Sequence, residues 1–260
     1  MKRLLPFLLV LACVICITLH WFYNYVTPAS HKAPYSISVP HDNDSLHVAF
    51  IGDSWAFWHK QHDTTLARLL SDTLQRPVHV SSYGVCGLTS KEIYLGLFNN
   101  PQMRRFISSK PFTICIVSAG INDTYKKLST DYYTQSMDGI VSFLLSNNIR
   151  PVVIELPDYD IETAFERQTA SRKALRRLMM TVNQLPVDCR QQYRDALRQL
   201  VRDKNYTDSI SLVPVRSWHT RDLYLHDGMH LNDAGWARLD SVFAKVIANT
   251  IDQNRTHHDK

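Results

Sequence analysis

A serine, a histidine and an aspartate stand in this sequence at positions suited to covalent catalysis. Ser54 ends the tripeptide Gly52-Asp53-Ser54, directly after the apolar run 47–51, which predicts a buried strand. A serine placed between a strand and a helix lies in a sharp corner with its hydroxyl presented. That hydroxyl is a weak nucleophile, so it needs a base and a third group that fixes the tautomer of the base. His230 and Asp227, three residues apart, fit these two roles.

Acyl transfer also needs donors aimed at the negative charge that develops on the carbonyl oxygen. Asn122, in Gly120-Ile121-Asn122-Asp123, follows the apolar run 113–117 and can offer its side-chain amide. Gly84, after the run 78–82, can offer a backbone N–H where a side chain would obstruct the substrate. We therefore expect Gly84 and Asn122 to contribute donors to an oxyanion hole.

These blocks resemble, residue by residue, those of the SGNH (GDSL-type) hydrolases. The resemblance rests on Ser54, Gly84, Asn122 and His230 with Asp227, and it covers roughly residues 48–247. It implies a catalytic triad of Ser54, His230 and Asp227, an oxyanion hole of Ser54, Gly84 and Asn122, and no cofactor. Each block alone is a weak signal, whereas their order, spacing and strand context together are specific.

The older family name, GDSL, stands for the tetrapeptide Gly-Asp-Ser-Leu. In this sequence Trp55 follows Ser54 in place of that leucine. Because Trp55 adjoins the nucleophile, we predict that it contacts the substrate. For the other aromatic residues near the proposed site, core packing is the default interpretation, with a sugar platform or an acyl pocket as the alternative. These residues are Phe57, Trp58, Trp218, Tyr224 and Trp236.

Strand and helix patterns alternate along the body of the chain. Short apolar, β-branched runs predict strands at 48–51, 78–82, 113–118, 152–156 and 210–213, and helical patterns include 64–74, 90–98, 132–146 and 232–251. Such alternation predicts an α/β fold: a three-layer α/β/α sandwich with a parallel, flavodoxin-like five-stranded sheet. Ligands of such sheets bind at the carboxyl ends of the strands, where Ser54, Gly84 and Asn122 fall.

The stretch 159–208 is longer than a simple crossover needs and predicts two helices, broken near residues 185–186. The first of them has cationic residues four apart, which form a positive face. We favour a solvated helix face over a grip for anionic glycan or phospholipid headgroups. The residues concerned are Arg167, Arg172, Lys173, Arg176 and Arg177.

The N-terminus predicts a membrane anchor. Residues 4–23 contain no Asp, Glu, Lys or Arg, and about 20 such residues can cross a bilayer as a helix. Lys2 and Arg3 precede this run, so the positive-inside rule places the catalytic domain on the extracytoplasmic side. A cleaved signal peptide, or a lipoprotein processed before Cys13, is the alternative, but the apolar run is long and continues beyond that cysteine.

Domain boundaries follow from these patterns. We predict an anchor over 1–26, a linker over 27–45, a hydrolase domain over 46–253 and a disordered tail over 254–260. Cys86, Cys115 and Cys189 fall in the domain, and one disulfide plus one buried thiol would fit their odd number, although the pairing is open. None of these cysteines lies in a motif typical of metal sites, so we expect no metal and no cofactor.

Composition is that of an ordinary globular chain, with 45% hydrophobic residues and a formal net charge of +5. The mild charge indicates solubility and gives no reason to expect a nucleic-acid partner. We expect an extracytoplasmic serine esterase that cleaves ester bonds through an acyl-enzyme, with an acylated glycan or a lipid as substrate. An O-acyltransferase acting on cell-surface glycan and a catalytically silent, membrane-tethered binding module are the alternatives.

Overall fold

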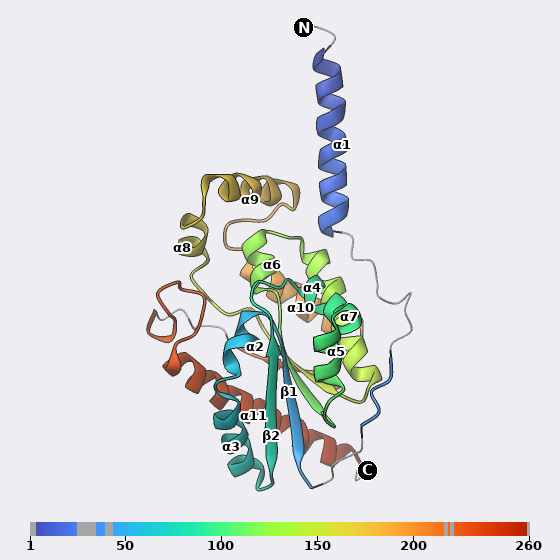
Figure 1. Cartoon of the computed structure of the whole chain (residues 1–260), viewed down its shortest axis with the longest axis vertical. Coiled ribbons are helices and arrows are strands. Elements are labelled where there is room, and N and C mark those ends of the chain that lie inside the picture. Colours follow the sequence, from blue (N-terminus) through green and yellow to red (C-terminus); the bar gives the residue numbers. More distant parts are fainter. Residues whose placement is uncertain (1–3, 25–34, 40–43, 216–217, 219–220, 259–260) are drawn as a thin grey trace.

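The fold centres on one parallel sheet covered by helices on both faces (Figure 1). The computed structural model describes residues 4–24, 35–39, 44–215, 218 and 221–258. Its five strands lie in the order β2-β1-β3-β4-β5, which is the flavodoxin-like order that the sequence predicts. Their bounds are β1 Leu46–Gly52, β2 Val78–Gly84, β3 Ile114–Ser118, β4 Arg150–Ile154 and β5 Ser211–Val213.

The helices form the two outer layers. Helices α3 and α11 pack on one face of the sheet, and α4, α7 and α10 cover the other. The bounds are α1 Leu4–Asn24, α2 Ser54–His59, α3 Asp63–Leu74, α4 Ser90–Asn99, α5 Pro101–Ile107, α6 Ile121–Lys126, α7 Thr130–Ser146, α8 Ile161–Glu166, α9 Ala170–Val182, α10 Arg190–Asp203 and α11 Asp233–His258, with a short 3-10 turn, η2, at Arg221–Leu223. The predicted α/β/α sandwich is therefore confirmed.

The central strands are apolar because both of their faces are covered. Phe50 and Ile51 of β1 and Ile116 and Val117 of β3 are fully buried. The register pairs Gly52 of β1 with Gly84 of β2 and with Ser118 of β3. The strands therefore end together, and the loops that follow them share one edge of the sheet.

The segment between β4 and β5 holds three helices where the sequence predicts two. The additional helix, α8, is only six residues long, too short to show an apolar period. Its start is fixed by the Asp160 carboxylate, which accepts a hydrogen bond of 2.9 Å from the Thr163 N–H. Helix α9 then begins after Thr169, whose hydroxyl caps the Arg172 N–H.

The ends of the hydrolase domain also differ from the predicted boundaries. Helix α11 continues to His258, so most of the predicted tail is helical; no proline or glycine follows Gly235 to end the helix earlier. Within the predicted linker, residues 35–39 lie on the domain. The Tyr35 hydroxyl donates to the Leu97 carbonyl at 2.8 Å, and the Ile37 N–H donates to Asn147 Oδ1 at 2.8 Å.

Helix α1 extends away from the rest of the molecule in Figure 1, and its apolar side chains, such as Phe7 and Ile17, are exposed. Among the residues that the structure describes, no helix combines the length and apolar character that a membrane crossing requires. The predicted anchor is therefore not confirmed.

Candidate active site

Ser54 lies where strand β1 turns into helix α2. Asp53 caps the helix, since its Oδ1 accepts a 3.0 Å hydrogen bond from the Trp55 N–H, and Ser54 is the first helical residue. The turn needs a glycine before it: a Cβ on Gly52 would lie 2.3 Å from the Ser118 carbonyl oxygen of the neighbouring strand. The corner therefore depends on close approach between β1 and β3.

The structure brings the three predicted triad residues into direct contact. His230 Nε2 lies 2.9 Å from Ser54 Oγ, and His230 Nδ1 lies 2.5 Å from Asp227 Oδ2. With Nδ1–H donating to the carboxylate, Nε2 is left to accept the proton of the serine hydroxyl. The two ring nitrogens thus have the separate partners that a general base requires.

Asp227 is held as a carboxylate by the loop that it orients. Partial burial alone would raise its pKa, but hydrogen bonds from the His230 backbone N–H and side chain, and from the Met229 N–H, bring the pKa below its ordinary value. The two backbone bonds to Asp227 Oδ1 measure 3.0 and 2.9 Å. The ring of His230 therefore faces an ionised partner at neutral pH.

Several backbone contacts fix the loop that holds the histidine. The Leu225 N–H donates to the His230 carbonyl at 2.7 Å, and Tyr224 forms an isolated antiparallel bridge with Leu231. Gly228 has φ +69°, a left-handed conformation that glycine adopts without strain. The loop is thus a tight hairpin-like turn rather than an extended tether.

Trp55 is not the substrate contact that the sequence suggests. Its side chain is fully buried, packs edge-on against Trp236, and donates from Nε1 to the Met229 carbonyl at 3.2 Å. A side chain without exposed surface offers nothing to a substrate. Trp55 instead joins the helix of Ser54 to the loop of His230, while Phe57 and Trp58 are the exposed aromatic residues of α2.

Asn122 lies in the first turn of α6, at the carboxyl end of β3. Gly120 before it has φ +104°, so the chain reverses sharply between strand and helix. One amide hydrogen of Asn122 is engaged, since Nδ2 donates to the Leu88 carbonyl at 2.9 Å. An amide has two N–H donors, so this bond orients the group and leaves the other donor for an oxyanion.

Gly84 ends β2 beside Gly52, at the same edge of the sheet. A Cβ at Gly84 would lie 2.2 Å from the Phe57 backbone nitrogen and 2.5 Å from the Asp53 carbonyl oxygen. The close backbone of α2 therefore requires a glycine at this position. The sequence instead suggests that the glycine leaves room for the substrate. No described hydrogen bond joins Gly84 or Asn122 to Ser54. All three residues nevertheless lie at the same edge of the sheet.

Two buried carboxyl groups, those of Asp53 and Asp123, hold the Ser54 and Asn122 motifs in place. The sequence gives no sign of this structural role. Asp53 Oδ1 accepts a 3.0 Å bond from the Ser118 hydroxyl, which ties α2 to β3. Asp123 accepts hydrogen bonds from the backbone and hydroxyl of Ser90, which ties α6 to the start of α4. Burial is the largest cause that raises the pKa of each aspartate to about 6.

A second group of polar residues lies buried behind the site. His59, at the end of α2, has its Nε2 2.8 Å from Asp240 Oδ1 on α11 and its Nδ1 3.0 Å from Asp63 Oδ1 on α3. The Ser82 hydroxyl of β2 also donates to Asp63. With a carboxylate beside each ring nitrogen, the imidazolium form of His59 can donate from both of its N–H groups. This buried cluster connects α2 to α3, β2 and α11.

The three thiols of the domain, Cys86, Cys115 and Cys189, are free. Among the described residues, no group of three or more His, Cys, Asp or Glu side chains is placed to hold a metal ion.

Comparison with known proteins identifies the family of this chain. The sequence profile of the GDSL-like lipase/acylhydrolase family matches residues 50–238, from strand β1 into helix α11. The chain belongs to the GDSL-like lipase/acylhydrolase family. No curated protein matches the sequence of this GDSL-like chain.

Solved structures share the fold of this GDSL-like protein at low sequence identity. A GDSL-like lipase from Bacteroides thetaiotaomicron has 15% identity and a TM-score of 0.52, covering 90% of this chain and 99% of that one. A lipase/acylhydrolase from Enterococcus faecalis has 13% identity and a TM-score of 0.51, with 78% and 96% covered. An acetyl-xylooligosaccharide esterase from Geobacillus stearmophilus has 16% identity and a TM-score of 0.53, with 78% and 94% covered. These likenesses show the fold alone.

Proposed function

We propose that this GDSL-like protein is a serine esterase that hydrolyses carboxylic esters through an acyl-enzyme. The observation that carries the proposal is the continuous chain of contacts from Ser54 Oγ to His230 and on to Asp227, at 2.9 and 2.5 Å. Family membership supports ester hydrolysis as the reaction class. The triad roles and the substrate are our inference.

The geometry supports a two-step mechanism. His230 takes the proton of Ser54, the serine oxygen bonds to the ester carbonyl carbon, and the alcohol leaves with the proton returned from His230. Water then attacks the acyl-enzyme with His230 as base, and the acid is released. The oxyanion of each step would accept hydrogen bonds from the backbone N–H of Ser54 and Gly84 and from the Asn122 amide.

The test is covalent labelling with a fluorophosphonate, which reacts with activated serines. We expect labelling of the native chain, its loss in Ser54→Ala, and hydrolysis of 4-nitrophenyl acetate by the native chain alone. A folded native chain that neither labels nor hydrolyses would instead be the silent binding module considered from the sequence.

The esterase of Geobacillus stearmophilus, named for acetylated xylooligosaccharides, makes an O-acetyl group on a glycan a reasonable first substrate. The same acyl-enzyme would serve an O-acyltransferase, in which a sugar hydroxyl replaces water. Adding a glycan acceptor to the 4-nitrophenyl acetate assay separates the two. Acetylated glycan forms with a transferase, and free acetate forms with an esterase.

We also propose that the catalytic domain works outside the cytoplasm, held by its N-terminal segment. The support is the sequence alone: Lys2 and Arg3 precede residues 4–23, which contain no charged side chain. This location is the periplasm or the cell surface, and protease treatment of intact cells and of spheroplasts, whose outer envelope is removed, is the test. We expect the domain to be degraded in at least one of the two preparations. Its full protection in both until the cytoplasmic membrane is lysed would contradict this location.

A further inference from the structure

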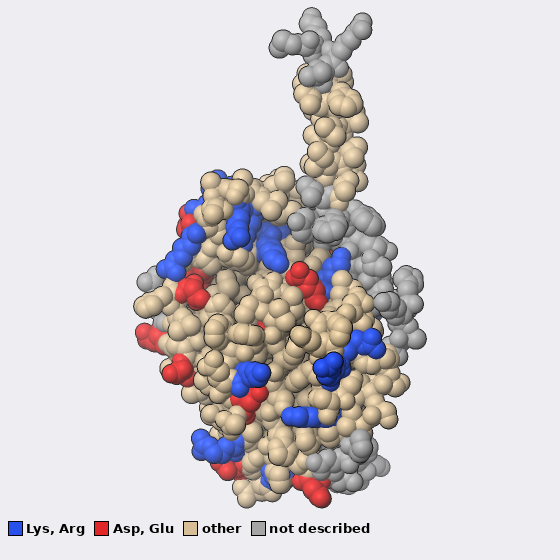
Figure 2. Space-filling model, in the orientation of Figure 1, with Lys and Arg blue, Asp and Glu red and all other residues tan. Residues whose placement is uncertain are grey.

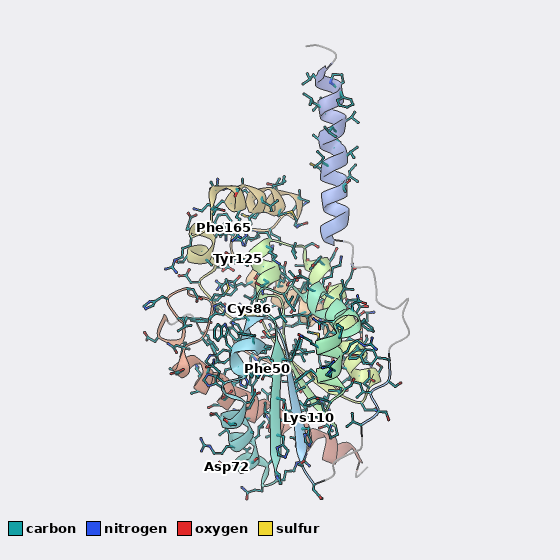
Figure 3. The ribbon with its side chains drawn as sticks, viewed as in Figure 1. Phe50, Asp72, Cys86, Lys110, Tyr125 and Phe165 are labelled. Atoms are coloured by element: carbon teal, nitrogen blue, oxygen red, sulfur yellow. The ribbon has the colours of Figure 1, made fainter. Side chains whose placement is uncertain are left out.

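A cavity of about 670 Å³ opens beside Asn122, between α4, α6 and α9. Its apolar walls include Leu128 and Met179, and its polar groups include Asn122, Tyr125 and Arg176. Figure 2 shows Lys and Arg side chains gathered over this end of the molecule. Figure 3 labels Tyr125 on α6, one of the residues that line the cavity. Because Asn122 also lines it, the cavity borders the proposed oxyanion donor.

Arg176 is the unusual residue of this cavity. The sequence predicts that it lies on a solvated helix face, yet its side chain is only 6% exposed. Its guanidinium stacks on the Tyr125 ring, 3.4 Å from the ring centroid, so its plane is fixed. Nη1 is buried and has no hydrogen-bond partner among the described residues. A guanidinium nitrogen in this state lacks the acceptor that buried cations ordinarily have.

The rest of the cavity offers the guanidinium little negative charge. Four cationic side chains line it, Lys91, Lys126, Arg172 and Arg176, against a single carboxylate, Glu92. The Oε2 of Glu92 caps α4, accepting from the Thr89 N–H at 2.8 Å and the Thr89 hydroxyl at 2.9 Å. It also lies 3.7 Å from Lys126 Nζ. Among the residues that line the cavity, cationic side chains therefore outnumber carboxylates.

We propose that the substrate of this esterase carries a carboxylate or phosphate group, separate from the ester, that binds Arg176 in this cavity. The inference rests on the proposed function, because Asn122 joins the cavity to the ester carbonyl. A planar guanidinium held on an aromatic ring presents its N–H groups to two oxygens of one anion. The apolar walls would enclose the part of the substrate between ester and anion.

Matched ester pairs test this proposal. One pair places the anion on the acyl side, 4-nitrophenyl hydrogen glutarate against 4-nitrophenyl pentanoate. The other set places it on the alcohol side, 4-acetoxybenzoate and 4-acetoxyphenyl phosphate against phenyl acetate. In at least one set the native enzyme should prefer the anionic ester, and Arg176→Gln should lower the anionic-to-neutral ratio of kcat/KM by about 10- to 100-fold.

Two further variants control the experiment. Arg177→Gln removes the neighbouring arginine of α9, which is exposed and does not line the cavity, and should keep the native ratio. Arg176→Lys keeps the charge without the planar fork and should restore part of the preference. Equal ratios in the native enzyme and in both Arg176 variants, with neutral esters still hydrolysed, would overturn the proposal.

A failure of the proposed esterase function can be distinguished from a failure of the proposed anion site. A native chain that hydrolyses none of these esters contradicts the esterase. The cavity is then tested by calorimetric titration with glutarate and with glycerol 1-phosphate. Binding that Arg176→Gln abolishes and Arg177→Gln retains supports the anion site. No binding of either anion to the native chain contradicts it.

Discussion

The buried cluster around His59 gives the most quantitative prediction for stability. His59 and Asp240 have almost no exposed surface, and the two carboxylates flank the ring at 2.8 and 3.0 Å. The substitution His59→Gln removes the cation and leaves Asp240 buried opposite an amide. Breaking one partner of a buried ion pair costs about 3–5 kcal/mol. For a domain of this size that corresponds to a fall in Tm of about 6–20 °C.

The pH dependence has a definite sign. Burial alone would lower the pKa of His59, but hydrogen bonds and charge from Asp240 and Asp63 raise it above its ordinary value. A histidine whose folded pKa is raised stabilises the fold fully below its unfolded pKa, about 6.5, and loses this contribution as pH rises through the folded value. The stability difference between native and His59→Gln proteins should therefore be largest near pH 6 and should shrink at alkaline pH.

The measurement is urea unfolding followed by tryptophan fluorescence, at pH 6 and again at alkaline pH. His62→Gln is the matched control, because His62 stacks on Trp236 at 5.4 Å and tests the loss of an aromatic ring next to the cluster. It should cost only about 0.5–1.5 kcal/mol. A His59→Gln protein within about 1 kcal/mol of native at pH 6, or a difference that grows with pH, would refute the reasoning.

Three further predictions concern the active site. Ser54→Ala and His230→Ala should each lower kcat by about 10⁴-fold or more, and Asp227→Asn by less, measured with 4-nitrophenyl acetate. Activity equal to that of the native enzyme in all three variants would contradict the triad. Gly84→Ala forces a Cβ to within 2.2 Å of backbone and should cost about 1–3 kcal/mol in urea unfolding; an unchanged midpoint would show that the helix shifts freely. The pKa of Asp53 is raised to about 6 by burial, so the contribution of Asp53 to native stability should fall as pH rises from about 4 to 6. Asp53→Asn should remove this loss and gain up to about 3 kcal/mol at pH 8, with no gain at pH 4; equal gains at both pH values would rule out ionisation as the cause.

The sequence predicts the sheet well because each strand is short, apolar and covered on both faces. The runs at 48–51 and 113–118 have this character, and both become strands of the central pair β1 and β3. Loops at the strand ends then place Ser54 and Asn122 at one edge of the sheet. His230 reaches Ser54 from a loop 176 residues away, and the spacing of its motif indicated that partnership.

Other features depend on contacts that no local pattern contains. Arg176 has cationic neighbours on α9, so its sequence context indicates solvent, and only the placement of Tyr125 on another helix buries it. His59 meets Asp240 across 181 positions, outside any motif. Helix α8 has too few residues for an apolar period. Contacts between residues far apart in the sequence therefore determine the burial and the roles of these residues.

The bond from Trp55 Nε1 to the Met229 carbonyl has a practical consequence. It puts an intrinsic fluorophore at the junction between the helix of Ser54 and the loop of His230. If the other four tryptophans of the chain were replaced by phenylalanine, emission from Trp55 would report when that junction separates. Assembly and opening of the proposed catalytic centre could then be followed optically, without substrate and without an attached dye.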